Sequence, residues 1–571
     1  MAKKPSIKSK SKNIAVGKID VGKDVSGNII VGHDNVINLS PEQIRLSSLH
    51  QLPPPPADFT GRETLIDQLL TDFNSHKGAT ISGLTGMGGI GKTALGLMVA
   101  NQLKEKFPDG QIFLDLKGTT EPLNAVEIAR HVILSFEPSA DLRALNESNM
   151  HAAYQSVLHG KQVFLYFDNA RSAAQISPLV PPISCALLVT SRWTFPVAGL
   201  SVHKLGVLKE AESIDFLLEI CPRIGDNATE LARTCGYLPL ALRIAGSFLQ
   251  VNSDWGIDKY LSQLRDRKRR LEMFKQSHDD AEILEADLRA TFDLSYTALS
   301  EEDRMRWRML GVFSMSFGSS AVQAMWETDE DETTKTMGLL RRYSLLEFEE
   351  NLSRFSLHDL LSDYSLSQMD AAEEQETRLK HALHYNDILS VADDLYLEGS
   401  EKILLGLRLF DLEWDHIRTA QAWVAATRST NRYSLELCTA FPNSGTYILS
   451  LRQHPRDKIQ WQDVALAAAR EIGDRRGEGN ALGNLGNAYA ALGDAKKAIE
   501  FYEQHLTITR EIGDRRGEGN ALYNMGLTLE GLNEKDQAVE SVRQALKLYE
   551  AIESPVAESA RNKLREWGAL E

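Results

Sequence analysis

The sequence predicts a multidomain protein: a short β-prone segment, an α/β domain, helical domains and a C-terminal helical solenoid. Three observations carry this prediction. The 571 residues exceed what a single hydrophobic core can organise. Short apolar runs alternate with helix-length segments up to about residue 205, and apolar positions at three- and four-residue spacing follow. The last quarter contains an internal repeat.

Composition and charge argue against a nucleic-acid-binding, disulfide-linked or membrane-spanning protein. Hydrophobic residues make up 43% and charged residues 25% of the chain, and the formal net charge is -16. Nucleic-acid binding is not expected of such an acidic chain, because phosphates require a basic surface. The four cysteines form no CxxC pair, and no apolar run reaches the ~18 residues of a membrane span. We therefore expect a cytoplasmic protein without disulfides, a zinc site or a membrane segment.

Residues 1–40 differ in composition from the rest of the chain. Seven lysines lie among Ser and Gly before residue 24, and either a disordered tail or a local basic patch would explain them. The segment VSGNIIVGHDNVINL, residues 25–39, alternates apolar and polar residues as strands do. A Pro-rich linker, residues 41–57, follows, because its run of four prolines favours extended backbone.

Four runs of β-branched and aromatic residues predict a parallel sheet within residues 58–205. They are ATISGL, QIFLDL, QVFLYF and CALLVTS, and each is a helix-length away from the next. The carboxyl ends of parallel strands meet at one edge of a sheet. We therefore expect the residues after these strands to lie close together.

The first of these strands leads into GMGGIGKT, which matches GxxxxGK[ST] and precedes a helical segment. Glycines let backbone N-H groups curl around phosphate oxygens, and the helix N-terminus adds partial positive charge. Lys92 is expected to reach the β- and γ-phosphates and Thr93 to hold Mg²⁺. The predicted phosphate-binding residues are Gly86, Gly88, Gly89, Ile90, Gly91, Lys92, Thr93 and Ala94.

Two later strands end in residues that suit the same nucleotide. Asp168 follows QVFLYF, where a carboxylate can hold Mg²⁺ through its water shell, and a strand-end cap is the alternative. Asn169 stands where many nucleotide hydrolases have a second carboxylate, and an amide cannot accept a proton from water. We therefore expect slow hydrolysis, with Lys92, Asp168 and Arg192 as the catalytic set. Arg192 follows CALLVTS and would contact a γ-phosphate or, alternatively, face solvent.

Residues 461–571 predict a helical repeat array. REIGDRRGEGNAL begins at Arg470 and again at Arg510, 40 residues later. Small residues at fixed places in paired helices let those helices share a core. LGNAYAALGDAKKAIEFYEQHL resembles a tetratricopeptide repeat, and residues 369–460 are expected to be a helical connector or degenerate repeat. The array is expected to bind a protein or peptide ligand, and a rigid spacer is the alternative.

Seven motifs occur in an order that resembles the NB-ARC family of signal-transducing (STAND) switch ATPases. This family includes plant disease-resistance proteins and bacterial proteins that end in tetratricopeptide repeats. The resemblance covers about residues 57–365 and implies a helical domain at 206–275 and a winged-helix domain at 276–368. The motifs are FTGRE (59–63), the phosphate loop, DNA (168–170), TSR (190–192), GYLPLAL (236–242), LSYTAL (294–299) and LHD (357–359).

The resemblance also implies contacts with an adenine nucleotide. Phe59, Thr60 and Arg62 resemble the segment that leads into the adenine pocket, and Pro239 corresponds to the proline that packs on the base. His358 corresponds to the histidine that touches the β-phosphate of ADP and locks a closed state. Without this context, an ordinary core or surface histidine would be the alternative.

Together these features predict a nucleotide-gated signalling switch and scaffold, for example in bacterial defence. ADP would hold the closed form, and exchange for ATP after ligand sensing by the repeats would open it and permit homo-oligomerisation. The alternative is a transcriptional regulator that binds DNA through its winged helix. Against it, no separate basic domain precedes the nucleotide domain, and the segment EEDRMRWR carries both signs of charge. Asn169 also disfavours a third possibility, an ordinary turnover enzyme.

The N-terminal segment would then carry the output. Ile29, Val31, Gly32, Asn35 and Ile37 are spaced like the core of RHIM-type amyloid motifs. Stacked identical strands satisfy one another's backbone hydrogen bonds and form Asn ladders, so the segment could template a matching strand on a separate effector. A hairpin packed on the chain's own body and a targeting role are the alternatives.

Overall fold

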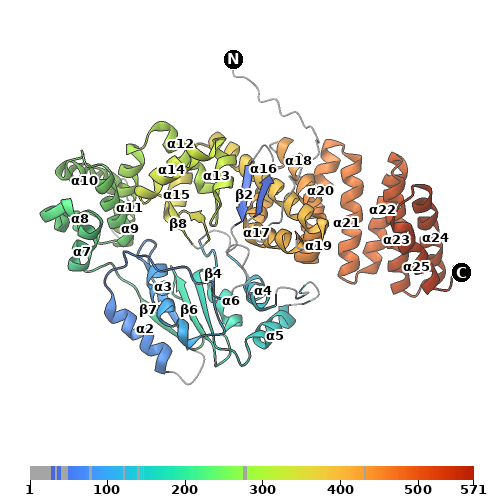
Figure 1. Ribbon diagram of the computed structural model, residues 1–571, viewed down its shortest axis with the longest axis horizontal. Helices are drawn as coiled ribbons and strands as arrows, with labels where there is room; N and C mark the ends of the chain where they lie inside the picture. Colours follow the sequence, from blue (N-terminus) through green and yellow to red (C-terminus); the bar gives the residue numbers. More distant parts are fainter. Residues whose placement is uncertain are drawn as a thin grey trace, which may run out of the picture.

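The computed structural model describes residues 27–31, 35–39, 49–75, 80–119, 122–137, 140, 142, 145, 147–273, 280–350, 352–400, 402–429 and 432–570. The predicted lysine-rich tail and the rest of residues 1–26 lie outside this range. An α/β layer lies to one side of the molecule, and helices lead away from it to the C-terminal end (Figure 1). The predicted multidomain fold class is confirmed. None of the described helices is long and apolar enough to cross a membrane.

The α/β layer contains one parallel sheet with the strand order β4-β5-β6-β3-β7. The four predicted strands are present, and β7 is a fifth that the prediction missed. Among the described strands β7 pairs with β3 alone, and its residues are exposed or half-buried, so the apolar signal of a buried strand is absent. The strands are β3 (Thr80–Thr85), β4 (Gly110–Asp115), β5 (Val163–Ala170), β6 (Ala186–Ser191) and β7 (Leu200–Lys204).

Helices cover both faces of this sheet. Alternate strand residues point to opposite faces, so Phe164 and Tyr166 of β5 join one core while Leu165 and Phe167 join another. The first core includes α2 (Glu63–Ser75) and α3 (Lys92–Gln102). The second includes α4 (Ala125–Phe136), α5 (Glu147–Leu158) and α6 (Ala173–Ile176), with the 3-10 turns η1 (Lys104–Lys106) and η2 (Ser177–Leu179) nearby in the chain.

Helices and one small sheet follow the α/β layer. Strands β8 (Glu347–Glu349) and β9 (Arg354–Ser356) form an antiparallel pair in the region where a winged helix is predicted. The helices are α7 (Glu210–Ile220), η3 (Pro222–Asn227), α8 (Ala228–Thr234), α9 (Pro239–Val251), α10 (Ile257–Met273), α11 (Asp280–Ala298), α12 (Glu301–Met309), η4 (Leu310–Val312), α13 (Ser319–Trp326), α14 (Glu330–Arg342) and α15 (Asp359–Ser367).

The repeated GDRRG segment marks where one repeat helix stops and the next begins. Gly473 and Gly513 end their helices with φ of 74° and 72°, a left-handed conformation that suits glycine. Asp474 and Asp514 then cap the next helices by accepting the N-H of Gly477 and Gly517. The helices of this half are α16 (Ala371–Glu398), α17 (Lys402–Thr427), α18 (Arg432–Ser444), α19 (Thr446–Arg452), α20 (Pro455–Ile472), α21 (Arg475–Ala491), α22 (Ala495–Ile512), α23 (Arg515–Gly531), α24 (Lys535–Ala551) and α25 (Val556–Glu566).

The N-terminal strands pair with each other. β1 (Gly27–Val31) and β2 (Asn35–Leu39) form an antiparallel hairpin in which Ile29 lies opposite Ile37. β1 lies beside α16 and β2 beside α13. This placement matches the alternative of a hairpin packed on the chain's own body. Strand stacking on an effector would require a free strand edge, and it stays a prediction.

Candidate functional site

The glycine-rich loop leaves β3, which lies between β6 and the edge strand β7, and ends at the first turn of α3. The Gly86 N-H donates to the Ser191 carbonyl at 3.3 Å, which fastens the loop to β6. Gly89 and Gly91 have φ of 73° and 86°, so a side chain at either position would strain the backbone. Gly91 is the N-cap of α3 and no described side chain caps that helix. The N-terminal N-H groups of α3 therefore have no side-chain cap, and a bound phosphate could accept hydrogen bonds from them.

Lys92 lies over this loop. Its Nζ donates to the carbonyls of Gly86 and Met87, both at 2.8 Å. Burial lowers the pKa of Lys92 to about 8, and the nearby Asp168 opposes the shift. Phosphate oxygens would offer the ammonium group stronger, charged acceptors than these two carbonyls. Ala94 lies in the same first helical turn, half-buried.

Asp168 and Thr93 come together as predicted from their strand and loop positions. Thr93 Oγ1 donates to Asp168 Oδ2 at 2.9 Å, and Tyr166 OH donates to Oδ1 at 3.1 Å. Thr190 also donates to this carboxylate. Burial raises the pKa of Asp168, and these three hydroxyl groups oppose the shift. The carboxylate therefore sits among side chains of three elements, and its oxygens with the Thr93 hydroxyl are hard ligands that suit Mg²⁺.

Asp359, at the first position of α15, is a residue that the sequence argument missed. Its Oδ2 accepts hydrogen bonds from Thr119 Oγ1 at 2.8 Å and from Asn169 Nδ2 at 3.1 Å. Arg192 forms an ion pair with the same oxygen at 3.3 Å. One carboxylate thus joins three donors of the α/β domain. Asp359 is part of the LHD motif, but the resemblance implies a nucleotide contact for the adjacent His358.

Asn169 has a structural reason to be an amide. Its φ of 56° is left-handed, a conformation that asparagine tolerates better than most residues. Its N-H donates to Thr190 Oγ1 at 2.9 Å, and its side-chain amide donates to Asp359. A carboxylate at this position would have no proton to offer Asp359. The arrangement agrees with the expectation of slow hydrolysis, which remains a prediction.

Asp115 is a second residue that the sequence argument missed. It ends β4, where it lies in register with Asp168 of β5, so two carboxylates share one sheet edge. Burial raises its pKa to about 8, and Asp359 and Asp168 add to the shift. The signal was present in QIFLDL, in which Asp115 follows an apolar run as Asp168 follows QVFLYF.

Arg62 precedes α2, and its side chain contacts the phosphate loop. Its guanidinium donates to the Ile90 carbonyl at 2.6 Å and to the Gly206 carbonyl at 3.0 Å. Burial lowers its pKa to about 10. Phe59 packs partly buried against the main core, and Thr60 is half-buried on the same turn. Of these three predicted residues, Arg62 is the one that contacts the phosphate loop.

Two further helices begin against the loop. At the start of α9, the Leu240 N-H donates to the Gly89 carbonyl at 3.3 Å, and Pro239 lies beside Gly91. At the start of α15, Leu360 lies so close to Gly88 that a Cβ there would approach Leu360 Cδ1 to 3.0 Å. The loop is therefore the point where parts of three predicted domains meet.

His358 caps the second of these helices. Its Nδ1 accepts the Leu360 N-H at 3.2 Å, which places the ring at the N-terminus of α15. This contact leaves Nε2 as the ring nitrogen available to another group. The predicted contact between His358 and a β-phosphate stays a prediction.

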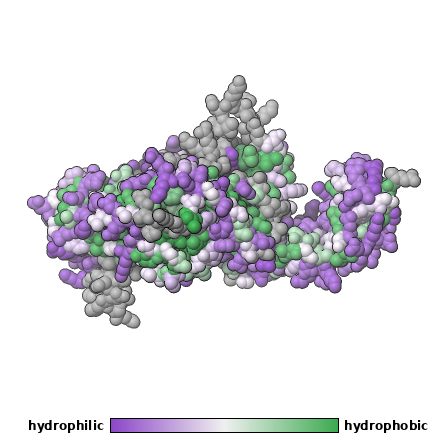
Figure 2. Space-filling model, turned by 90° about the horizontal axis from the view of Figure 1, so that it is seen from below, coloured by the Kyte–Doolittle hydropathy of each residue, from purple (hydrophilic) through white to green (hydrophobic). Residues whose placement is uncertain are grey.

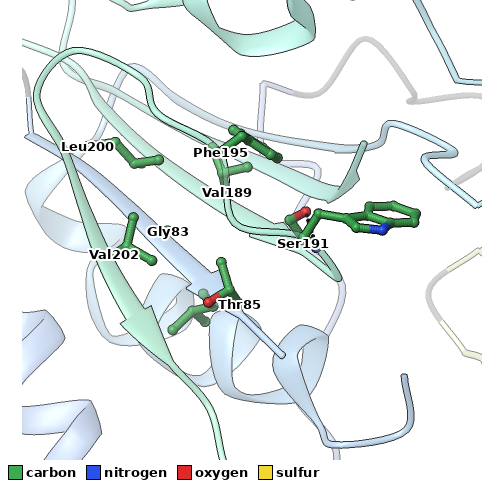
Figure 3. A pocket seen from close by; sticks show the side chains of 9 residues that line it. Gly83, Thr85, Val189, Ser191, Phe195, Leu200 and Val202 are labelled. Atoms are coloured by element: carbon green, nitrogen blue, oxygen red, sulfur yellow. Dashed lines mark hydrogen bonds between the residues drawn. The ribbon is translucent and has the colours of Figure 1, made fainter. Parts of the chain in front are cut away.

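A small apolar pocket also lies near the loop (Figure 3). Its walls come from β3, β6 and β7 and from the segment that connects β6 to β7. Val189 and Phe195 belong to the core on the α4 and α5 face of the sheet, whereas Lys92 leads into α3 on the opposite face. The described lining residues include none of the predicted phosphate ligands. The lining residues are Gly83, Leu84, Thr85, Val189, Ser191, Trp193, Phe195, Leu200 and Val202.

These features define a class: a phosphate-loop protein whose later helical domains close onto the loop and which ends in helical repeats. Comparison with known proteins agrees. The tetratricopeptide repeat family profile matches residues 459–511 and 477–551. The regulatory protein AfsR of Streptomyces griseus is 31% identical over 344 residues, which cover 58% of this chain and 34% of AfsR. The matched part of this chain therefore spans about a third of the length of AfsR.

Other relatives are more distant. A putative HTH-type transcriptional regulator of Mycobacterium tuberculosis is 23% identical over 414 residues, covering 68% of this chain and 44% of that protein. A putative disease resistance protein of Solanum bulbocastanum is 22% identical over 345 residues, covering 54% and 34%. A STAND protein with a tetratricopeptide repeat sensor from Pyrococcus horikoshii has 15% identity and a TM-score of 0.42, covering 89% of this chain and 86% of that one. The sequence relatives and the repeats confirm the resemblance to NB-ARC ATPases with C-terminal tetratricopeptide repeats.

Proposed function

We propose that the protein is a nucleotide-gated signalling switch. The observation that best supports this proposal is that several domains contact the phosphate loop or lie beside it. The contacting residues are Arg62, Leu240 and Leu360, and Asp359 lies beside the loop. A nucleotide in that loop touches parts of several domains at once, so it can favour one arrangement of them over another. A ligand shifts such an equilibrium only through its different affinities for the two forms.

Charge explains why ADP and ATP would favour different forms. Asp168 and Asp359 lie near Lys92, and both raise the pKa of Asp115. Asp359 also raises the pKa of Asp168. A diphosphate leaves the Arg192–Asp359 ion pair intact. A third phosphate would compete with Asp359 for Arg192 and add negative charge beside three carboxylates. ADP therefore stabilises the closed form, and ATP favours the release of α15.

Mg²⁺, held by Thr93 and Asp168, would neutralise part of the phosphate charge when it is bound. Hydrolysis is slow, because Asn169 donates to Asp359 and cannot act as a base. Slow hydrolysis then sets how long the open form lasts. The catalytic contributions of Lys92, Asp168 and Arg192 are to bind and orient the phosphates.

The repeat array would bind a protein or peptide and shift the same equilibrium. Helix α17 connects the two regions, since Lys117 of the α/β domain pairs with Asp415 at 2.7 Å and Glu127 pairs with Arg418 at 3.0 Å. Lys117 is buried and Asp415 is partly exposed, so solvent screens this contact only in part. The opened form would associate with further copies of the chain in the cytoplasm. Its N-terminal strands would pass the signal to an effector, a step that deletion of residues 1–39 tests.

A transcriptional regulator is the second candidate, because the mycobacterial relatives are described as putative HTH-type transcriptional regulators. The helix before the β8–β9 pair bears on this candidate. α14 begins with Glu330, Asp331 and Glu332, all exposed, and such a run repels a phosphate backbone. A gel-shift assay with random duplex DNA at low salt distinguishes the two candidates, since salt-sensitive binding would favour the regulator.

The switch is tested by the nucleotide content and oligomeric state of the purified protein. We expect ADP on a monomer, and larger assemblies after exchange for a non-hydrolysable ATP analogue. Lys92→Ala should abolish nucleotide binding, whereas Lys104→Ala, an exposed lysine of the same domain, should leave it unchanged. Equal affinity of the protein for ADP and ATP, with no change in assembly, would contradict the proposal.

A further inference from the structure

The segment that follows β4 is held against the end of β5. We call its first residues, 116–119, the β4–α4 loop. The N-H groups of Leu116 and Gly118 donate to the carbonyls of Asp168 and Asn169 at 2.8 and 2.7 Å. A Cβ at Gly118 would overlap the Asn169 carbonyl oxygen, so the two backbones are in close contact. The loop is therefore fixed to the strand that carries the candidate Mg²⁺ ligand.

Two side chains of this loop reach two different helices. Thr119 Oγ1 donates at 2.8 Å to Oδ2 of Asp359, which begins α15. Lys117 Nζ pairs at 2.7 Å with Oδ1 of Asp415, which lies on α17. The two loop residues are only two positions apart. One short segment thus connects α15 with α17, and both of them with the candidate nucleotide site.

Lys117 is unfavourable at its position for two reasons. Its φ of 55° is left-handed, a conformation that lysine rarely adopts. Its side chain is only 3% exposed, and lysine is almost never buried without a partner. Asp415 supplies that partner. Without it the ammonium group would be buried and unpaired, so the loop would rearrange to bring the group to water.

α17 lies between the last repeats and the α/β domain. Figure 2 shows the last repeats as a hydrophilic lobe that a hollow sets off from the body of the molecule. α17 packs against α16 and α18, and it contacts the α/β domain through Asp415 and Arg418. A movement that begins in the repeats can therefore reach the α/β domain through α17.

We propose that the β4–α4 loop is a relay through which α17 controls how firmly the α/β domain holds α15. While Asp415 pairs with Lys117, the loop keeps its left-handed residue and Thr119 meets Asp359. When α17 moves away, Lys117 turns towards water, and the change in its backbone withdraws Thr119 from Asp359. The closed form then loses one of its contacts and becomes less stable. This inference rests on the proposed nucleotide switch and specifies how a signal from the repeats reaches it.

The relay predicts that two separate changes act on one contact. Asp415→Asn keeps an oxygen for Lys117 but removes the charge, and Thr119→Val keeps the shape but removes the hydroxyl group. Stopped-flow release of a fluorescent ADP analogue from the full chain measures the effect. We expect each change to speed release about fivefold, as loss of one hydrogen bond would. The double variant should also be about fivefold faster, whereas independent contacts would give about twenty-fivefold.

Another ion pair between the same two elements supplies the matched control. Glu127 of α4 pairs with Arg418 of α17 at 3.0 Å, outside the loop. Glu127→Gln removes this pair but keeps an oxygen for the Asn124 N-H that Glu127 accepts. Its effect on ADP release should multiply that of Thr119→Val. Asp415→Glu retains the charge and should restore slow release, and urea unfolding checks that every variant is folded.

Hydrogen exchange follows the loop without any nucleotide. The N-H groups of Leu116 and Gly118 are protected by their hydrogen bonds to β5. Asp415→Asn should raise exchange in the peptide that contains the β4–α4 loop and in the peptide that begins α15. Glu127→Gln should leave exchange in both peptides unchanged.

Release rates that multiply in the double variant of Asp415 and Thr119 would overturn the relay. So would unchanged exchange of residues 116–119 in Asp415→Asn. Either result would leave the nucleotide switch standing, because α17 could act through other contacts. Conversely, equal affinity for ADP and ATP would contradict the switch, and the exchange experiment would still decide whether α17 controls the loop and α15.

Discussion

Asn169 and Asp359 form a single hydrogen bond that joins α15 to the α/β domain at the candidate site. Asn169 donates to Asp359 at 3.1 Å, next to Arg192 at 3.3 Å and Thr119 at 2.8 Å. All three donors come from the α/β domain, and the acceptor begins α15. This contact attracts α15 to the domain only while Asp359 faces hydrogen-bond donors. A neutral amide at position 169 therefore makes the contact attractive, whereas a carboxylate there would make it repulsive.

Asn169→Asp should therefore weaken the closed form. The new carboxylate would face Asp359 with no proton to share, and like charges at hydrogen-bond distance repel even at a high effective dielectric. We expect ADP to dissociate about tenfold faster, measured by stopped-flow release of a fluorescent ADP analogue. Adding Asp359→Asn should restore slow release by reversing the two roles. Unchanged release in the single variant would show that this contact does not hold the closed form.

At the scale of elements, α3 depends on a close approach to β5. Gly96 of α3 lies directly over Tyr166, where a Cβ would overlap the phenol ring. The Tyr166 hydroxyl in turn donates to the Thr93 carbonyl at 3.2 Å and to Asp168 at 3.1 Å. One glycine thus allows a strand residue to support both the loop and the carboxylate.

Gly96→Ala should destabilise the α/β domain and weaken nucleotide binding. Overpacking a tight contact costs about 1–3 kcal/mol, and displacement of Tyr166 would shift Asp168 as well. Urea unfolding followed by isothermal titration with ADP measures both effects. Gly531→Ala is the matched control, because that helical glycine has open space around it. It should leave ADP affinity unchanged and should not lower the free energy of unfolding. Full ADP affinity in Gly96→Ala would separate the packing of α3 from the site.

At the scale of the whole molecule, α16 and α17 connect the winged-helix region with the repeats through a buried polar cluster. His416 of α17 contacts the Ser316 carbonyl at 3.0 Å, and Arg354 of β9 pairs with Glu413. His381 and His384 of α16 are also buried. Burial lowers the pKa of His384 and His416 to about 4. The charged and titratable groups around His416 include Glu413, Arg354, Lys117, Asp415, His381, His384 and Tyr385.

This cluster predicts a loss of stability in mild acid. The folded histidines have lower pKa values than the unfolded chain, for which about 6.5 is usual. The contribution of the neutral histidines to the free energy of unfolding is complete above pH 6.5 and is lost as pH falls from there towards 4. Over this range the unfolding equilibrium constant rises about tenfold per pH unit for each histidine. Urea midpoints between pH 7.5 and 4.5 measure it. His416→Gln should flatten the dependence and exposed His151→Gln should not. A flat profile in the unaltered protein would exclude the mechanism.

The sequence identified the features that depend on neighbours in the chain. The strand, loop and helix around Lys92 follow from local composition, and so do the apolar strand before Asp168 and the glycine and aspartate signals of the repeats. β7 was missed because an exposed edge strand lacks a continuous apolar run. Asp115 and Asp359 were missed because the apolar run before Asp115 and the LHD motif do not reveal which distant groups these two acids meet.

The sequence by itself determined the order of the domains, the phosphate loop and the period of the repeats, since each is fixed by the spacing of residue types along the chain. Tertiary structure alone decided that Asp359 meets Asn169 and Arg192, that α17 docks on the α/β domain through Lys117, and that β1 and β2 lie beside α16 and α13. These contacts join residues far apart in the chain. They depend on how whole surfaces fit together, and that fit is not encoded in any short segment.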